Sequence, residues 1–343
     1  MSDVTISPLT DAEFDAWNDY VHVAEDATFF HLAEWQTIFD KVLGHRTYYM
    51  LAKQGSEIAG IFPLVHVKSR LFGSALISVP FSVYGSVLAN DASVKAALIE
   101  NAVKLGQQLK VDYVELRELQ DSGLDWETKD LYVTFRKTLL PTEEENFKAI
   151  PRKQRAMVRK AIDSGLTSAW DSNIDRFYAM YSESVRNLGT PVLAKKYYQA
   201  LFDIFADKCS VLTILNDDEP VSSVLNFYFK DQVLPFYGGG TTAARACKAN
   251  DFMYWELMRL SVEQGIKIFD FGRSKNGAGS YRFKKHWGFE PEPLYYRFHL
   301  INATQMPDLS PVNPKLQLAV KMWQKLPLPV SRTLGPIIAR NLG

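Results

Sequence analysis

The same order of sequence patterns occurs twice along this chain, and this repetition constrains the fold more than any other feature. In each half, helical apolar spacing and short apolar runs broken by glycine or proline indicate helices and antiparallel strands. A long helical pattern follows, at residues 92–109 and again near 251–264, and each leads into an apolar strand. We therefore expect two copies of one fold, each combining a sheet with flanking helices.

Length and local patterns define the expected parts. The 343 residues exceed one ordinary core and suit two domains, which we place at 1–140 and 141–300, before a helical tail at 301–343. Further helices are predicted at 28–44, 174–188, 195–206 and 315–326. Strands are predicted at 48–53, 57–67, 75–79, 113–117, 131–139, 209–215, 221–229, 232–238 and 266–271.

Composition excludes several classes of protein. Hydrophobic residues make up 47% of the chain and charged residues 23%, as in globular proteins, and 39 basic residues balance 39 acidic ones. Cys209 and Cys247 form no C-x-x-C pair, and the six histidines show no ligand spacing, so we expect neither a metal nor a cofactor. The sequence carries no signal peptide pattern and no long apolar stretch, so we expect a cytoplasmic protein.

Residues 237–289 hold the densest candidate chemistry. The three glycines after Tyr237 either let a ligand approach the backbone or form a tight strand end. Asp270 ends an apolar strand, the location where α/β sheets collect ligand groups. Because Arg273 and Lys275 follow closely, a structural ion pair and a catalytic base both remain open for this carboxylate.

The run YRFKKHWGF at residues 281–289 mixes aromatic rings with four potential cations. Such a run suits a site for an anionic or ester-bearing substrate, in which a lysine stabilises the charge that develops during acyl transfer. A packed helix end with lysines that reach solvent is the alternative. Upstream, five cations at residues 152–160 either grip tRNA or lipid phosphates or form a solvated face beside the acidic run 143–145.

These segments together resemble a known family. The second half is similar to the second domain of the FemABX transferases in Tyr237-Gly238-Gly239, Trp255, Asp270-Phe271-Gly272 and Phe283-Lys284. Residues 31–35 and 80–87 of the first half resemble the family more loosely. The order of PRKQRAMVRK, SVRNLGTP, KANDFMYWELMR and FDFGRSK is most similar to FemAB-like proteins of exosortase (PEP-CTERM) systems.

The resemblance implies two tandem GNAT-like domains, an α/β (α+β) fold with mixed, largely antiparallel sheets. It implies an acyltransferase or aminoacyltransferase that forms an amide on an amine-bearing cell-envelope or exopolysaccharide precursor. Lys284 and Asp270 would be the catalytic residues. Four others would contact substrate: Tyr197, Tyr237, Phe283 and Arg273.

Two departures bear on the substrates. Leu193 stands where the peptidoglycan enzyme has an arginine for the nucleotide-sugar phosphates, which argues against a UDP-muropeptide acceptor. Residues 240–245 lack the glycine pattern that holds the pyrophosphate of acyl-CoA. Aminoacyl-tRNA and acyl-CoA both stay open as donors. The alternatives are a non-catalytic binding module of exopolysaccharide assembly and an acyl-CoA-dependent N-acyltransferase.

A second question about binding partners concerns the tail. Five apolar side chains share a stripe of the helix predicted at 315–326: Leu316, Ala319, Val320, Trp323 and Leu326. The stripe either packs on the protein's own domains, the commoner arrangement, or lies on the inner face of the membrane. In the second case, residues 315–338 would make a peripheral membrane contact and bring the protein to a lipid-linked precursor.

Overall fold

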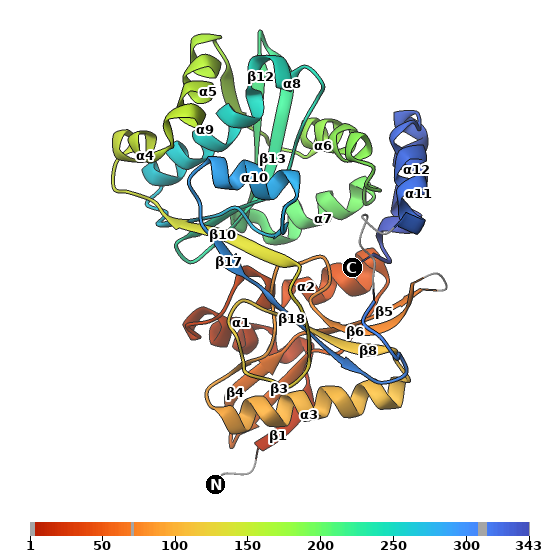
Figure 1. Ribbon diagram of the computed structural model, residues 1–343. Helices are drawn as coiled ribbons and strands as arrows, with labels where there is room; N and C mark the ends of the chain where they lie inside the picture. Colours follow the sequence, from red (N-terminus) through yellow and green to blue (C-terminus); the bar gives the residue numbers. More distant parts are fainter. Residues whose placement is uncertain (1–3, 70–71, 308–313, 343) are drawn as a thin grey trace. The chain divides into compact units, whose positions relative to one another are not determined.

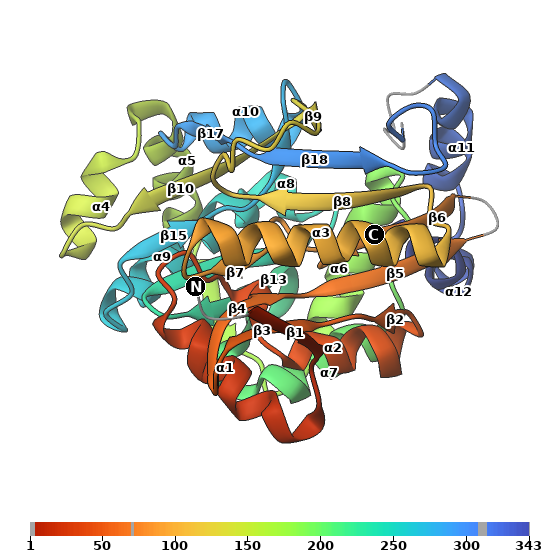
Figure 2. The same cartoon turned by 90° about the horizontal axis from the view of Figure 1, so that it is seen from below.

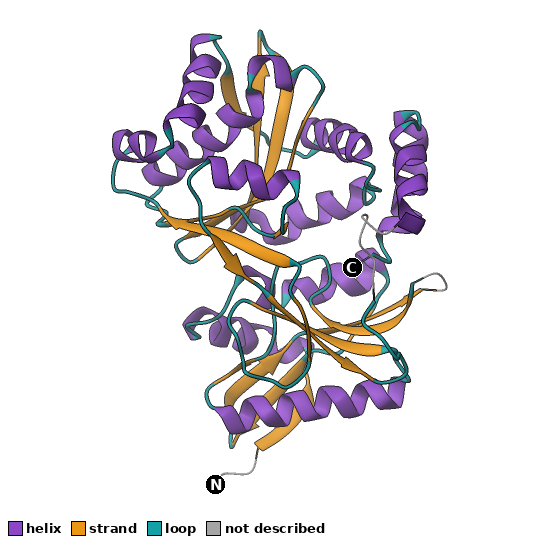
Figure 3. Ribbon diagram, in the orientation of Figure 1, coloured by secondary structure: helices purple, strands orange, loops and turns teal. Residues whose placement is uncertain are grey.

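The computed structural model (Figure 1) describes residues 4–69, 72–307 and 314–342 as a mixed α/β protein that divides into two compact units. Unit 1 comprises residues 1–132, 293–308 and 340–343, and unit 2 comprises 133–292 and 309–339. Each unit combines strands with helices, as Figure 3 shows by colour. The predicted fold class, with mixed and largely antiparallel sheets, is confirmed.

Unit 1 contains two sheets and one long helix. Its helical segments are η1 (Asp11–Glu13), α1 (Phe14–Val23), η2 (Phe29–His31), α2 (Glu34–Thr37), η3 (Ile38–Leu43) and α3 (Ala92–Leu109). Its strands are β1 (Val4–Pro8), β2 (Arg46–Thr47), β3 (Met50–Gln54), β4 (Glu57–Phe62), β5 (Leu64–Ser69), β6 (Gly73–Ser78), β7 (Leu88–Ala89), β8 (Tyr113–Glu118), β9 (Glu127–Lys129) and β18 (Tyr295–Leu300).

The strands of unit 1 follow the orders β1-β3-β4-β7 and β2-β5-β6-β8-β18-β9. Neighbours are antiparallel except β6 and β8, which run parallel. A parallel pair needs a crossover connection, and α3 supplies it while packing against strands of both sheets (Figure 2). The helix begins at Asp91, whose carboxylate accepts the backbone N–H groups of Ser93 and Val94, and it ends at Lys110 in the left-handed conformation.

The last strand of unit 1 comes from a distant part of the chain. β18 lies between β8 and β9, so residues 293–300 belong to unit 1, whereas we placed them in the second domain. The Arg297 guanidinium fixes this strand because Nε donates to Glu118 on β8 at 3.0 Å. A strand's own sequence does not state which strand it will pair with, so this placement could not be predicted locally.

Unit 2 holds the remaining elements. Its helical segments are α4 (Glu143–Ala149), α5 (Arg152–Asp163), α6 (Asp175–Leu188), α7 (Lys195–Phe205), η4 (Ala206–Lys208), α8 (Ala244–Cys247), α9 (Ala249–Glu263), α10 (Gly279–His286), α11 (Pro314–Gln324) and α12 (Leu328–Ala339). Its strands are β10 (Tyr132–Thr138), β11 (Thr167–Trp170), β12 (Cys209–Asn216), β13 (Glu219–Phe229), β14 (Gln232–Gly240), β15 (Ile268–Asp270), β16 (Ser274–Lys275) and β17 (Pro291–Pro293).

The sheet of unit 2 follows the order β11-β12-β13-β14-β15-β10-β16, with β17 also paired to β10. The parallel ladder between β14 and β15 covers only Gln232 and Val233 on the β14 side. Beyond it, β14 continues along β13 to Gly240, with a register shift that leaves Phe236 as a bulge between Pro235 and Tyr237. The bulge changes the direction of the strand next to the tyrosine that the sequence singled out.

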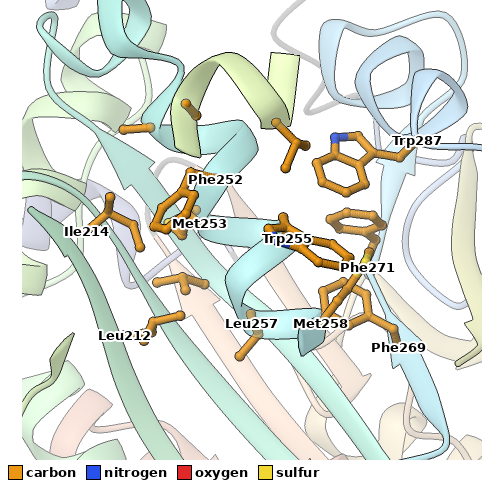
Figure 4. Close-up of a cluster of buried hydrophobic side chains, with 14 of the residues drawn as sticks. Leu212, Ile214, Phe252, Met253, Trp255, Leu257, Met258, Phe269, Phe271 and Trp287 are labelled. Carbon is orange, nitrogen blue, oxygen red and sulfur yellow. The ribbon is translucent and has the colours of Figure 1, made fainter. Parts of the chain in front are cut away.

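The core of unit 2 packs around α9. Figure 4 shows Phe252, Met253 and Trp255 of this helix among buried side chains of β12 and β15, with Phe271 and Trp287 beside them. Burial of each large apolar side chain contributes about 1.5–3 kcal/mol. This packing holds the end of β15 and the helix α10, which together carry the candidate site.

The tail packs on unit 2. Both α11 and α12 contact α6, and the Arg332 guanidinium donates to Ser182 Oγ at 2.9 Å. Val320, Trp323 and Leu326 of the predicted stripe are partly buried, whereas Ala319 is exposed. The side chain of Leu316 lies outside the described residues. The structure thus shows the stripe packed on the protein itself.

Candidate functional site

Asp270, the last residue of β15, is fully buried and well provided with donors. One carboxylate oxygen accepts hydrogen bonds from Thr134 Oγ1 at 3.1 Å and from the Gly272 backbone N–H at 2.7 Å. The other lies 3.4 Å from Nε of Arg136, which faces Asp270 across the antiparallel pair of β10 and β15. Asp270 therefore forms an ion pair with Arg136, a residue that the sequence did not suggest as its partner.

Lys284 on α10 is a buried cation next to this carboxylate. Its Nζ donates to the backbone carbonyl oxygens of Gly272 at 2.8 Å and Arg273 at 3.1 Å, and it lies over the rings of Phe135 and Phe271. Burial lowers the pKa of Lys284 to about 7; the charge of Asp270 opposes this effect and that of Arg273 adds to it. The side chain can therefore carry or release its proton near neutral pH.

Aromatic packing holds α10 in place. Phe283 lies between Tyr254, Phe271 and Trp287, with ring centroids 5.6, 6.4 and 6.2 Å away. Trp287 is itself buried, and the neighbouring Lys285 reaches outward to Glu290. Most of the run 281–289 is thus a packed helix end, and Lys284 is the cation within it that turns inward. Phe283, expected to contact substrate, packs against the core in this structure.

The two candidate tyrosines contact each other. Tyr197 on α7 is 1% exposed, and its hydroxyl lies 3.1 Å from that of Tyr237 on β14. Tyr181 and Tyr198 pack edge-on against the Tyr237 ring, at centroid distances of 5.5 and 5.2 Å. Burial raises the pKa of Tyr197 well above its usual value, so both hydroxyls act as neutral hydrogen-bonding groups.

Arg273 connects these two groups electrostatically. Its charge lowers the pKa of Lys284 and also opposes the burial that raises the pKa of Tyr237. The structure therefore brings five of the six predicted site residues into two coupled groups, Asp270 with Lys284 and Tyr197 with Tyr237, through Arg273. Their catalytic and binding roles remain predictions.

The sequence did not indicate several residues that shape the site. Thr134 and Arg136 come from β10, more than a hundred residues before Asp270, and Phe135 lies between them. The alternation of residues 131–139 predicted this strand, but it did not identify the strand's partner. The β10 pairing is therefore the missing information.

The glycines after Tyr237 have a packing reason. A Cβ on Gly239 would lie 2.7 Å from the Ser184 Cβ and 3.3 Å from the Tyr181 Cα on α6. A Cβ on Gly240 would lie 2.8 Å from the Ala244 Cβ. The glycines let helices approach the end of β14 closely, which favours the structural interpretation of this motif.

The basic run forms the helix α5. Arg152, Lys153 and Lys160 are exposed there, while Arg159 lies over the Phe147 ring at 5.4 Å. The acidic run before it belongs to α4, where Thr142 and Glu145 form a capping box and Glu144 pairs with Lys148. Among the described residues, no group of three or more His, Cys, Asp or Glu side chains is placed to hold a metal ion. Nor is any helix in the described part long and apolar enough to cross a membrane.

Residues 152–285 match the family model of the acetyltransferase (GNAT) domain. This segment spans α5 to α10 and contains all six predicted site residues. No curated protein matches the chain in sequence.

Three solved structures share the fold over most of the chain. FemX is 16% identical with a TM-score of 0.64, covering 87% of this chain and 98% of its own. The C-terminal domain of a protein described as a lysylphosphatidylglycerol synthetase from Agrobacterium fabrum is 12% identical, with a TM-score of 0.56 and coverages of 84% and 91%. A tandem GNAT protein from the clavulanic acid biosynthesis pathway is 10% identical, with a TM-score of 0.54 and coverages of 86% and 98%.

These likenesses establish the fold. The expected tandem GNAT architecture is confirmed, and the expected similarity to FemABX proteins holds at the level of structure through FemX. The association with exosortase systems stays a prediction.

Proposed function

We propose that this protein transfers an acyl or aminoacyl group to an amine and so forms an amide. The observation that carries the proposal is the buried lysine of α10: Lys284 is 8% exposed and held on the carbonyls of Gly272 and Arg273. A fixed cation in a water-poor site stabilises the oxyanion that forms when an amine attacks an ester or thioester carbonyl. The GNAT match over the same residues supports this reaction class.

In the proposed reaction, the acceptor amine attacks the acyl carbonyl, and Lys284 as ammonium stabilises the negative oxygen of the tetrahedral intermediate. The bond to the leaving alcohol or thiol then breaks, and the proton lost by the amine ends on the leaving group. Asp270 orients the site, because its oxygens already contact Thr134, Gly272 and Arg136. Tyr237 and Arg273 would contact the substrate.

The proposed acceptor is an amine-bearing precursor of the cell envelope or of an exopolysaccharide. Both donors remain candidates. The exposed cations of α5 suit the phosphates of an aminoacyl-tRNA, whereas the GNAT fold itself suits acyl-CoA. Purified protein would be given each donor separately with an envelope extract, and products would be identified by mass. Binding without product would favour a non-catalytic binding module instead.

Substitution of Lys284 tests the site. Lys284→Met keeps the length of the side chain and removes its charge, so turnover should fall at least about tenfold, or about 1.4 kcal/mol of barrier. Lys285→Met is the matched control, because Lys285 points outward and pairs with Glu290. It should keep the activity. Unchanged turnover in Lys284→Met, with thermal unfolding showing a folded protein, would refute the assignment.

A further inference from the structure

Exposed apolar side chains concentrate in the tail. Among the described residues, six of the twelve large apolar side chains that are exposed belong to residues 314–342. On α11, Leu318 is 67% exposed and Met322 is 63% exposed. On α12, Val330 and Leu334 are also exposed. Scattered apolar residues are normal on a surface, but such a concentration on two adjacent helices in sequence indicates a binding surface.

The opposite faces of the same helices already hold the tail to unit 2. A Cβ on Gly335 would lie 2.7 Å from the backbone oxygen of Val192, and one on Gly189 would lie 2.5 Å from a methyl group of Val320. Arg332 bonds to α6, as described above. Since other side chains make this attachment, Leu318, Met322 and Leu334 are not needed for it.

Charge indicates the partner. Residues 314–343 contain five basic residues and no acidic one, in a chain that is otherwise rich in both signs. Lys321 and Lys325 share the outer face of α11 with Leu318 and Met322, because helical residues three and four apart are neighbours. Exposed apolar side chains flanked by lysines suit the boundary between anionic headgroups and acyl chains.

A second copy of the chain fits this surface less well. In a symmetric dimer the same patch meets itself, so the lysines of one copy would approach those of the other. Like charges brought together in this way oppose association. A bilayer that contains anionic lipid instead offers a counter-charge to every lysine.

We propose that the outer faces of α11 and α12 bind the surface of an anionic bilayer. Leu318, Met322 and Leu334 enter the headgroup region, and Lys321 and Lys325 contact lipid phosphates. This inference goes beyond the proposed reaction. The surface differs from the stripe expected from the sequence, since Val320 and Trp323 of that stripe face the protein.

Sedimentation with vesicles tests the surface. The full chain should bind vesicles that contain about one-third phosphatidylglycerol, bind pure phosphatidylcholine much less, and lose binding as salt rises. Leu318→Gln with Met322→Gln should weaken binding to the anionic vesicles by about tenfold. Lys321→Gln with Lys325→Gln should weaken it by about tenfold as well. Val23→Gln, at an 81% exposed apolar residue on α1, is the matched control and should bind normally.

Two outcomes overturn the proposal. One is a full chain that ignores anionic vesicles at low salt, or a Leu318→Gln, Met322→Gln protein that binds them as the unchanged chain does. The other is a concentration-dependent dimer, seen by analytical ultracentrifugation, that disappears in this double variant while vesicle binding is absent. The vesicle assay contains neither donor nor acceptor, so a failure of the proposed reaction leaves its result unaffected.

Discussion

Both units contain a buried cation close to a parallel pair of strands, but the two cations donate hydrogen bonds to different kinds of group. In each unit, a strand leads through a long helix into a parallel neighbour, β6 to β8 in unit 1 and β14 to β15 in unit 2. Arg117 on β8 donates to the Glu115 carboxylate at 2.8 Å and to the Ser82 carbonyl at 3.2 Å. Lys284, next to the end of β15, donates to two backbone carbonyls.

This difference separates a structural cation from a responsive one. Burial alone would lower the pKa of Arg117, but the charge and hydrogen bond of Glu115, together with the nearby Tyr296 and Tyr132, more than offset it, so the guanidinium stays charged. Burial lowers the pKa of Lys284 to about 7 because carbonyl oxygens compensate its charge less completely. A buried ion pair specifies a fold, whereas a cation that titrates near neutral pH is suited to chemistry.

The largest expected effect is the loss of the unit 1 pair. Arg117→Met leaves Glu115 buried beside an apolar side chain, so the free energy of unfolding should fall by about 3–5 kcal/mol. Lys284→Met leaves no directly hydrogen-bonded carboxylate behind, so its free energy of unfolding at pH 7 should fall by no more than about 1 kcal/mol. Denaturant unfolding of both variants measures this contrast. Equal losses of unfolding free energy would show that the two cations contribute equally to stability.

The next largest loss of stability is expected at Gly239, which lies close to Tyr181 and Ser184 on α6. Gly239→Ala places a Cβ against Ser184 and Tyr181, so stability should fall by about 1–3 kcal/mol. Turnover should fall too, because Tyr181 packs on Tyr237. The control is Gly279→Ala at the start of α10, where a Cβ would have no neighbour within 4 Å. Its stability should stay within about 1 kcal/mol of the unchanged chain, and a loss equal to that of Gly239→Ala would contradict the packing argument.

The smallest effect is a pH dependence of stability of about 1 kcal/mol per pH unit. The pKa of Lys284 is about 7 in the folded chain, and an unfolded lysine has a pKa of about 10.4. Between these values the unfolded state binds more protons, so this lysine makes stability rise with pH, by at most about 1.4 kcal/mol per pH unit. Below pH 7, Lys284 is protonated in both the folded and the unfolded state. Its destabilising effect has then reached its full size and no longer changes with pH.

The pH measurement compares unfolding free energies of the unchanged chain and Lys284→Met from pH 7 to pH 9. The free energy of unfolding of the unchanged chain should rise, relative to that of the variant, by about 1 kcal/mol per pH unit. Arg117 adds no such slope, because it keeps its proton throughout this range. Parallel curves for the two proteins would mean that Lys284 keeps its proton in the folded state.

Local patterns predicted many of the elements. The helix predicted at 92–109 is observed at the same residues, and the strand predicted at 232–238 is β14. Strong apolar periodicity carried both predictions. The basic segment that became α5 is amphipathic but carries few large apolar residues, and the aromatic and basic residues of β18 show no clear alternation. Residues 293–300 belong to unit 1, and not to the second domain as expected, because β18 pairs with β8, which is far away in sequence.

The group around Asp270 was predictable where its residues are close in sequence. Asp270, Arg273 and Lys284 lie within fifteen residues of one another, and the motif around them is distinctive. The Arg136 partner of Asp270 depends on the pairing of β10 with β15, which no local pattern specifies. The lowered pKa of Lys284 depends on burial by Phe135 and Phe271, which follows from the same pairing.

The position of β18 in the unit 1 sheet also sets an order of events during synthesis. A ribosome must make all of residues 133–292 before it releases the strand that lies between β8 and β9. Until then one edge of β8 has no neighbouring strand, and Glu118 lacks its partner Arg297, which comes 179 residues later in the sequence. We therefore expect the larger sheet of unit 1 to be completed only after residues 133–292 of unit 2 can already pack.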